Sequence, residues 1–336
     1  MTPSNHRYEN LDKAKGLAII LVVLGHIVAR EGPAGNEWMM QLKALIYKFH
    51  MPVFMAISGI TFALSSERLQ TVHDLATFIR ARSARLVPGF VLFALAIWLG
   101  KIIAAAFIKV DNAPLDQWYA LITIFTDPAA SSAGSLWYVY VLLELTIVFA
   151  LYRLFFRDNL IYIVLCAGAA HLLQTQINVP SELGLRLFCE YAWYFAVGLV
   201  IAKNLAWVAT FVVAQRVFFI CLFALSFATI PIATAWQSKW LIGMTAIPAI
   251  YVLASSAKSK GVNAILLTLG RYTFCIYLMN TIMIGLTKGV MLKLLSWDYG
   301  NFALYFVALT LVGLVGPILF YRNVLRHIPY LKRVTN

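Results

Sequence analysis

Two histidines stand at the ends of apolar segments, where an imidazole can take part in proton transfer. His26 closes the first apolar segment after Leu24 and Gly25, and His50 opens the second, two residues before Pro52. Because histidine titrates near neutral pH, either side chain can act as a general base or as a nucleophile. The alternative is that both are interfacial polar residues at helix ends, without a chemical role.

Three arginines lie close together in the sequence, at Arg80, Arg82 and Arg85. A spacing of three places Arg82 and Arg85 on one face of a helix, with Arg80 nearby. Guanidinium groups bind phosphate oxygens through paired hydrogen bonds, so this face can hold a polyanion such as a phosphate cluster. The same residues also fit a simpler role, as basic anchors at the cytoplasmic end of a membrane span.

Two acids, Glu144 and Glu190, interrupt otherwise aromatic and aliphatic segments. A carboxylate in hydrocarbon is costly enough to require a partner or a proton. Lys101 stands at the end of the expected span 86–100 and is the basic residue assigned to neither side, so the sequence allows a Lys101–Glu144 pair. A structural ion pair and a catalytic acid both fit these residues.

The motifs of several other chemistries are absent. The sequence has no Walker loop, no Gly-x-Gly-x-x-Gly after a strand and no run with metal-ligand spacing, so we expect no bound metal. The four cysteines form no Cys-x-x-Cys pair and lie in or beside apolar runs, which favours a role as small apolar side chains.

The elements that must hold these residues follow from the composition. Hydrophobic residues make up 62% of the 336 residues and charged residues 12%, against about 45–50% and about 25% in soluble domains. This excludes an ordinary soluble enzyme and leaves room for about ten helices that cross a bilayer. The net charge of +13 is explained by basic cytoplasmic loops, so no nucleic-acid partner is expected.

The apolar runs predict an all-α, polytopic membrane bundle that forms a single domain over residues 1–336. The expected spans are 16–29, 49–66, 86–100, 134–152, 159–181, 187–202, 217–238, 240–257, 272–287 and 299–321. The apolar run 204–215 is too short to cross alone, so it is an interfacial helix or an extension of the following span. The longest breaks are expected at 65–80 and 110–133.

Charge asymmetry predicts the orientation of the bundle. With both termini cytoplasmic, most Lys and Arg residues fall on the inner side, Arg153 and Lys203 among them, while few, such as Arg30 and Lys109, fall outside. His26 and His50 then lie near the outer face, brought to similar depth by two antiparallel neighbours. The arginine face instead lies at the cytoplasmic side.

Several of these segments together resemble the acyltransferase 3 family of membrane O-acyltransferases, and most closely its fucose 4-O-acetylase-like branch. The resemblance covers most of the chain. It is carried by residues 7–26 (RYENLDKAKGLAIILVVLGH), 49–59 (FHMPVFMAISG), Arg82-x-x-Arg85-x-x-Pro88, Leu136-Trp137-Tyr138 and, more weakly, 270–278 (GRYTFCIYL).

The resemblance implies a helical membrane bundle that uses acetyl-CoA as donor and hydroxyls of surface or exported glycans as acceptors. It implies that His26 is the catalytic histidine and that Arg82 and Arg85 support donor binding. Asn280 departs from the pattern, because many relatives have histidine at this position, and the resemblance therefore assigns it no role.

Together these arguments predict an acyl-CoA-dependent O-acetyltransferase of the inner membrane that acts on a glycan or a lipid-linked sugar. Its site would comprise His26 and His50 as catalytic residues and Arg80, Arg82 and Arg85 at the donor. His26 would either deprotonate the acceptor hydroxyl or first take the acyl group itself. The alternatives are a transporter or flippase for a polyprenol-linked sugar and a non-catalytic membrane subunit.

Overall fold

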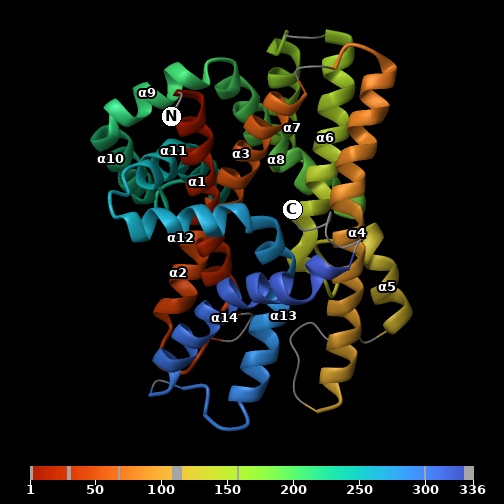
Figure 1. The fold of residues 1–336 in the computed structure, drawn as a ribbon, viewed down its shortest axis with the longest axis vertical. Coiled ribbons are helices and arrows are strands. Elements are labelled where there is room, and N and C mark those ends of the chain that lie inside the picture. Colours follow the sequence, from red (N-terminus) through yellow and green to blue (C-terminus); the bar gives the residue numbers. More distant parts are fainter. Residues whose placement is uncertain are drawn as a thin grey trace.

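The chain is helical throughout the part that the structure describes (Figure 1). The computed structural model covers residues 3–28, 32–66, 69–107, 116–156, 159–298 and 300–328, with side chains from residue 9 onward. Within these ranges no strand forms, and an isolated β-bridge joins Ala34 and Asp298. The prediction of an all-α fold is confirmed.

Of the four 3-10 helices among the described residues, Leu325–His327 follows the last α-helix, and the other three lie in connections between the α-helices. The bounds of the α-helices are α1 Pro3–His26, α2 Trp38–Ile46, α3 His50–Ser65, α4 Val72–Ala105, α5 Gln117–Thr126, α6 Trp137–Phe156, α7 Ile161–Gln176, α8 Leu185–Lys203, α9 Leu205–Ala214, α10 Arg216–Ser226, α11 Ala235–Ser255, α12 Lys260–Arg271, α13 Thr273–Met291 and α14 Phe302–Asn323.

Seven helical stretches among the described residues are long and apolar enough to cross a membrane. They are Trp38–Ser65, Val72–Ala105, Gly134–Phe156, Glu182–Lys203, Ala235–Ser255, Thr273–Met291 and Phe302–His327. The class of a multi-pass helical bundle is therefore confirmed.

The expected count of about ten spans is not reached by these stretches and stays a prediction. Helices α9 and α10 are long and apolar enough to cross only when they are taken together. This pair is bent by 80° and would make an eighth span. Helix α7 has 16 residues, fewer than a span needs. In α1 the first half carries charges at Glu9, Asp12, Lys13 and Lys15. Residues 29 and 299, at the limits of two expected spans, lie outside the described ranges.

The expected span 217–238 is wrong. Helix α10 ends at Ser226, a 3-10 turn follows over Phe227–Thr229, and α11 begins only at Ala235. Pro231 stands in the gap, where it has no N–H to continue a helix. The backbone N–H of Thr234 then donates to Oε1 of Gln237 at 3.1 Å, which starts the next helix.

The expected inner break at 65–80 is also wrong, because most of it is helix. Helix α4 begins at Val72 and has 34 residues. Thr71 and Asp74 form a capping box at its start: the Asp74 N–H donates to Thr71 Oγ1 at 3.1 Å, and the Thr71 N–H donates to Asp74 Oδ2 at 2.9 Å. The arginine face therefore sits well inside a long helix.

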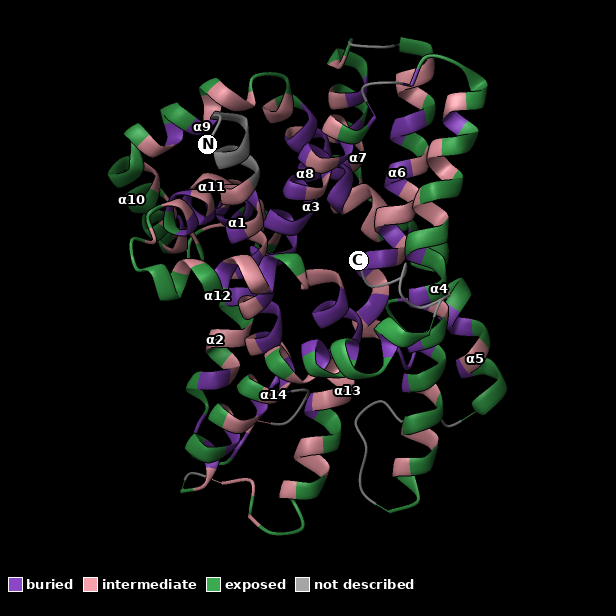
Figure 2. Ribbon diagram, in the orientation of Figure 1, coloured by how far each residue is buried: buried purple, intermediate pink, exposed green. Residues whose placement is uncertain are grey.

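Helix α1 lies among other helices, which bury the segment of α1 that precedes His26. It packs against α3, α11, α12 and α13, and its side chains from Ala18 to Val23 are largely buried (Figure 2). Helices α5, α9 and α10 lie at the margins of the view in Figure 1 and carry many exposed residues. The core thus holds the C-terminal end of α1 in a fixed position.

Helices α3 and α8 cross closely at Gly59 and Gly198. A Cβ on Gly59 would lie 2.1 Å from the carbonyl oxygen of Phe195, and one on Gly198 would lie 2.1 Å from that of Ala56. No real Cβ approaches so closely, so the small residue is required for packing. Gly59 is therefore a packing contact between α3 and α8.

We expect Gly59→Ala to destabilise the bundle by about 1–3 kcal/mol, because the added methyl group forces α3 and α8 apart. The measurement is the midpoint of thermal unfolding in detergent. Gly100→Ala on α4 is the matched control, since nothing lies within 4 Å of a Cβ there. Equal midpoints for the two variants would contradict the packing role of Gly59.

Candidate active site

His26 is the last residue of α1 and remains partly exposed. Its Nδ1 lies 2.7 Å from Oδ1 of Asn280 on α13. Side chains of the α2 region satisfy nearby backbone carbonyls: the Tyr47 hydroxyl donates to Gly25 O at 3.1 Å and Lys43 Nζ donates to Val28 O at 2.8 Å. These contacts fix the helix end that presents the imidazole.

Asn280 is fully buried, with 0% of its surface exposed. Its Nδ2 donates to the carbonyl oxygens of Ile276 and Tyr277, each at 2.9 Å. Sequence reasoning assigned this residue no role. The sequence signal that could have identified Asn280 is an amide side chain in an apolar helix, where an unpaired polar group is costly.

His50 begins α3 and is 5% exposed. Its Nδ1 lies 2.8 Å from the carbonyl oxygen of Ile46, and its ring centroid lies 4.9 Å from that of Tyr47. Since Tyr47 also bonds to Gly25, it connects the surroundings of His50 with the end of α1. The structure thus brings both histidines to one region and gives His26 the greater access.

Arg82 and Arg85 lie on neighbouring positions of one face of α4 and act on each other electrostatically. Arg82 Nη2 donates to Ser65 Oγ at 2.5 Å, and its guanidinium lies 5.4 Å from the centroid of the Phe78 ring. Arg85 is exposed. Arg82 thus also binds the C-terminal end of α3. A purely structural role of Arg82 would explain this contact.

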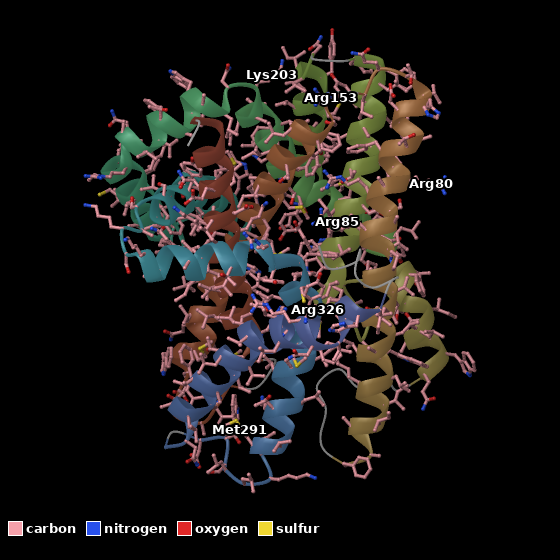
Figure 3. All side chains as sticks on the ribbon, in the orientation of Figure 1. Arg80, Arg85, Arg153, Lys203, Met291 and Arg326 are labelled. Atoms are coloured by element: carbon pink, nitrogen blue, oxygen red, sulfur yellow. The ribbon has the colours of Figure 1, made fainter. Side chains whose placement is uncertain are left out.

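Arg80 does not join this face. It is exposed, and Figure 3 shows its side chain pointing away from the bundle, whereas Arg85 lies on the inner side of α4. At about 100° per residue, Arg80 is turned by about 160° from Arg82 and by about 140° from Arg85. The expectation that Arg80 lies close to the other two guanidinium groups is therefore wrong.

A row of hydroxyl groups lies between the arginine face and Asn280. The Ser58 and Tyr138 hydroxyls are 2.7 Å apart, and Arg82 acts electrostatically on Tyr138. The ring centroids of Tyr138 and Tyr277 are 5.3 Å apart, and the Tyr277 hydroxyl donates to Ser135 O at 2.5 Å. Tyr277 lies one turn before Asn280 on α13, and its carbonyl oxygen accepts from Asn280 Nδ2, so this row reaches the helix that carries Asn280.

The two acids have different surroundings. Glu190 forms an ion pair with Lys239, whose Nζ also lies 5.7 Å from the centroid of the Tyr191 ring. Glu144 forms no ion pair among the described residues, and its Oε2 is buried without a hydrogen-bond partner. The Lys101–Glu144 pair is therefore not formed, because Glu144 faces Gly184 in the turn before α8.

The described residues form no metal site. No group of three or more His, Cys, Asp or Glu residues is placed to hold a metal ion in the part of the chain that the structure describes. A cavity of about 450 Å³ lies between α7, α8 and α11, with Trp193, Trp236 and Trp240 in its wall. The residues that line it include neither His26 nor the arginine face.

Comparison with known proteins places the chain in a family. The family model described as "Acyltransferase domain", of the acyltransferase 3 family, matches residues 8–322. The nodulation protein NolL of Sinorhizobium fredii is 29% identical over 208 residues, which are 60% of this chain and 50% of NolL. NolL of Mesorhizobium japonicum is 24% identical over 207 residues, which are 61% and 50% of the two chains.

The alignments with both NolL proteins span about half the length of those relatives. No solved structure matches the chain significantly. The family match, in contrast, covers nearly the whole chain and includes His26, His50 and the arginine face. The chain belongs to the acyltransferase 3 family and is a membrane acyltransferase.

Proposed function

We propose that this chain moves an acetyl group from acetyl-CoA on the cytoplasmic side to a hydroxyl of a cell-surface or lipid-linked glycan. One observation carries the proposal: a series of contacts leads from Arg82 through Tyr138 and Tyr277 to Asn280, which meets His26. It joins a cationic face suited to phosphates with an imidazole suited to proton transfer.

The chemistry at His26 is a proton transfer coupled to acyl transfer. The imidazole takes the proton of the acceptor hydroxyl, the oxygen attacks the thioester carbonyl, and the C–S bond breaks. The imidazolium then returns its proton to the departing thiolate, so no net charge remains. Attack by His26 itself, followed by transfer from an acyl-histidine, gives the same products with ping-pong kinetics.

The donor end of the site is Arg82 and Arg85. Coenzyme A is made in the cytoplasm and carries phosphates that need cationic partners. Its pantetheine arm is about as long as half of a bilayer core or more, so the thioester can reach inward from the arginine face. Ser58, Tyr138 and Tyr277 supply hydroxyls beside this route.

Orientation supports a donor from the inside and an acceptor from the outside. Lys203 and Arg153 lie toward the same end of the bundle in Figure 3, as basic residues at a cytoplasmic face do. We propose accordingly that the chain is a multi-pass protein of the inner membrane with both termini in the cytoplasm. Arg30 and Lys109, expected on the outer side, lie outside the described residues.

The test is a ligand screen of the full chain purified in nanodiscs. We expect acetyl-CoA to raise the unfolding midpoint, with succinyl-CoA and longer acyl-CoAs as competitors. Label from [1-14C]acetyl-CoA should then enter the lipid-linked sugar or polysaccharide fraction of cells that express the chain. Absence of stabilisation by every acyl-CoA would overturn the proposal, and translocation of a sugar without acyl-CoA would favour a transporter.

A further inference from the structure

The buried amide of Asn280 has its orientation fixed by the backbone of its own helix. Its Nδ2 donates both hydrogens, to the carbonyl oxygens of Ile276 and Tyr277. A flipped amide would instead point its oxygen at two carbonyl oxygens, and no donor would meet either of them. Oδ1 is therefore the atom that faces His26.

This orientation determines where the proton of His26 sits. Oδ1 of an amide only accepts hydrogen bonds, and His26 Nδ1 lies 2.7 Å from it. Nδ1 must then carry the hydrogen and donate it. In a neutral imidazole the second nitrogen is left without a proton, so Nε2 holds the lone pair.

We propose that Asn280 is a positioning residue that holds His26 in the tautomer with a proton on Nδ1 and a free lone pair on Nε2. Oδ1 accepts from Nδ1 both before and after Nε2 takes up a proton, so the ring need not turn during the reaction. The logic is that of the residue behind the histidine in a catalytic triad, here with a neutral amide in place of a carboxylate. The inference rests on the proposed function, because it makes Nε2 the nitrogen that reacts.

The other contacts near His26 do not supply this acceptor. Lys43 and His50 are the other ionisable side chains that act on His26 electrostatically. Lys43 donates to Val28 O and His50 Nδ1 is taken by Ile46 O. Tyr47 donates to Gly25 O. Among the described residues near the ring, Asn280 therefore provides the hydrogen-bond partner of Nδ1 and fixes its proton.

The first test compares Asn280→Leu with Thr281→Val. Leucine keeps the approximate volume and removes the acceptor, whereas Thr281 is the next residue on α13 and its hydroxyl meets Ser135 Oγ at 3.3 Å. We expect Asn280→Leu to lower kcat by about 100-fold or more and to leave KM for acetyl-CoA within about two-fold. Thr281→Val should retain kcat. An Asn280→Leu enzyme with kcat within three-fold of wild type would overturn the inference.

The second test does not depend on activity. Diethyl pyrocarbonate acylates an unprotonated ring nitrogen, so its rate at His26 reports the lone pair on Nε2. Without the acceptor, the proton can move to Nε2 and leave the lone pair on Nδ1, against residue 280. We expect modification of His26, followed by peptide mass spectrometry, to slow about five-fold or more in Asn280→Leu.

Exposed His73 on α4 is the internal control and should react at the same rate in both proteins. An unchanged rate at His26 would overturn the positioning role. If the wild-type chain shows no acetyl transfer but His26 still slows in the variant, the proposed function fails and the assignment of Asn280 stands. The retained acetyl-CoA-induced thermal shift shows that each variant is folded.

Discussion

Replacing His26 by alanine is expected to abolish acetyl transfer, with a loss of about 100- to 10,000-fold in kcat, because no other group takes the proton of the acceptor. His26 is the partly exposed imidazole at the end of α1, whereas the nearby His50 is 5% exposed and bonded to Ile46 O. Binding of acetyl-CoA should change by no more than a few-fold, since the phosphates bind elsewhere. The measurements are single-turnover transfer and calorimetry.

Two further variants separate catalysis from folding. His73→Ala removes an exposed imidazole from α4 and should leave turnover unchanged. His50→Ala should cost less than His26→Ala, unless the two rings form one relay. Retained turnover in the His26 variant would contradict a catalytic role. His26 would then be an interfacial polar residue at a helix end, which is the alternative that the sequence allowed.

The fold class and the location of His26 could be predicted because they depend on local patterns. Long apolar runs identify membrane helices whatever their neighbours are, since a bilayer requires a minimum length. His26 stands where the first such run ends, and α1 ends at that residue. Hydropathy fails where the backbone breaks inside an apolar run, as it does between α10 and α11 around Pro231.

The placement of Arg80 could have been predicted from helix geometry. Two residues of separation turn a side chain by about 200°, so Arg80 cannot share a face with Arg82 when both lie on one helix. The prediction considered only how close these residues are in sequence, because a break was expected over 65–80 and left Arg80 outside the helix. The capping box at Thr71 and Asp74 was the signal that the helix starts earlier.

Partners far apart in the chain could not be predicted. Asn280 and His26 are 254 positions apart, and Glu190 and Lys239 are 49 apart. The cost of a buried polar group predicts that each has a partner but not which one. Choosing Lys101 for Glu144 used the same reasoning and was wrong, because the choice depends on how the helices pack.

Replacing both Arg82 and Arg85 by alanine is expected to weaken acetyl-CoA binding by about 100- to 10,000-fold. Each hydrogen bond to a charged group contributes about 1.5–3 kcal/mol, and two guanidinium groups are lost. Arg85→Lys should also bind more weakly than wild type, since lysine keeps the charge but loses the paired hydrogen-bond geometry. Calorimetry in detergent measures the dissociation constant for acetyl-CoA and for free CoA.

Arg80→Ala is the matched control, because it removes a positive charge from the same helix on the opposite face. A general effect of membrane-surface charge would weaken binding in Arg80→Ala as well, whereas a donor site on one face of α4 predicts unchanged affinity.

Ser65→Ala tests the structural contact of Arg82 separately, since it removes the 2.5 Å bond and leaves both guanidinium groups in place. If Ser65→Ala lowers the unfolding midpoint but not the affinity, and the double arginine variant lowers the affinity, then Arg82 supports α3 and binds the donor. Equal affinity of wild type and the double variant would remove the donor site from this face.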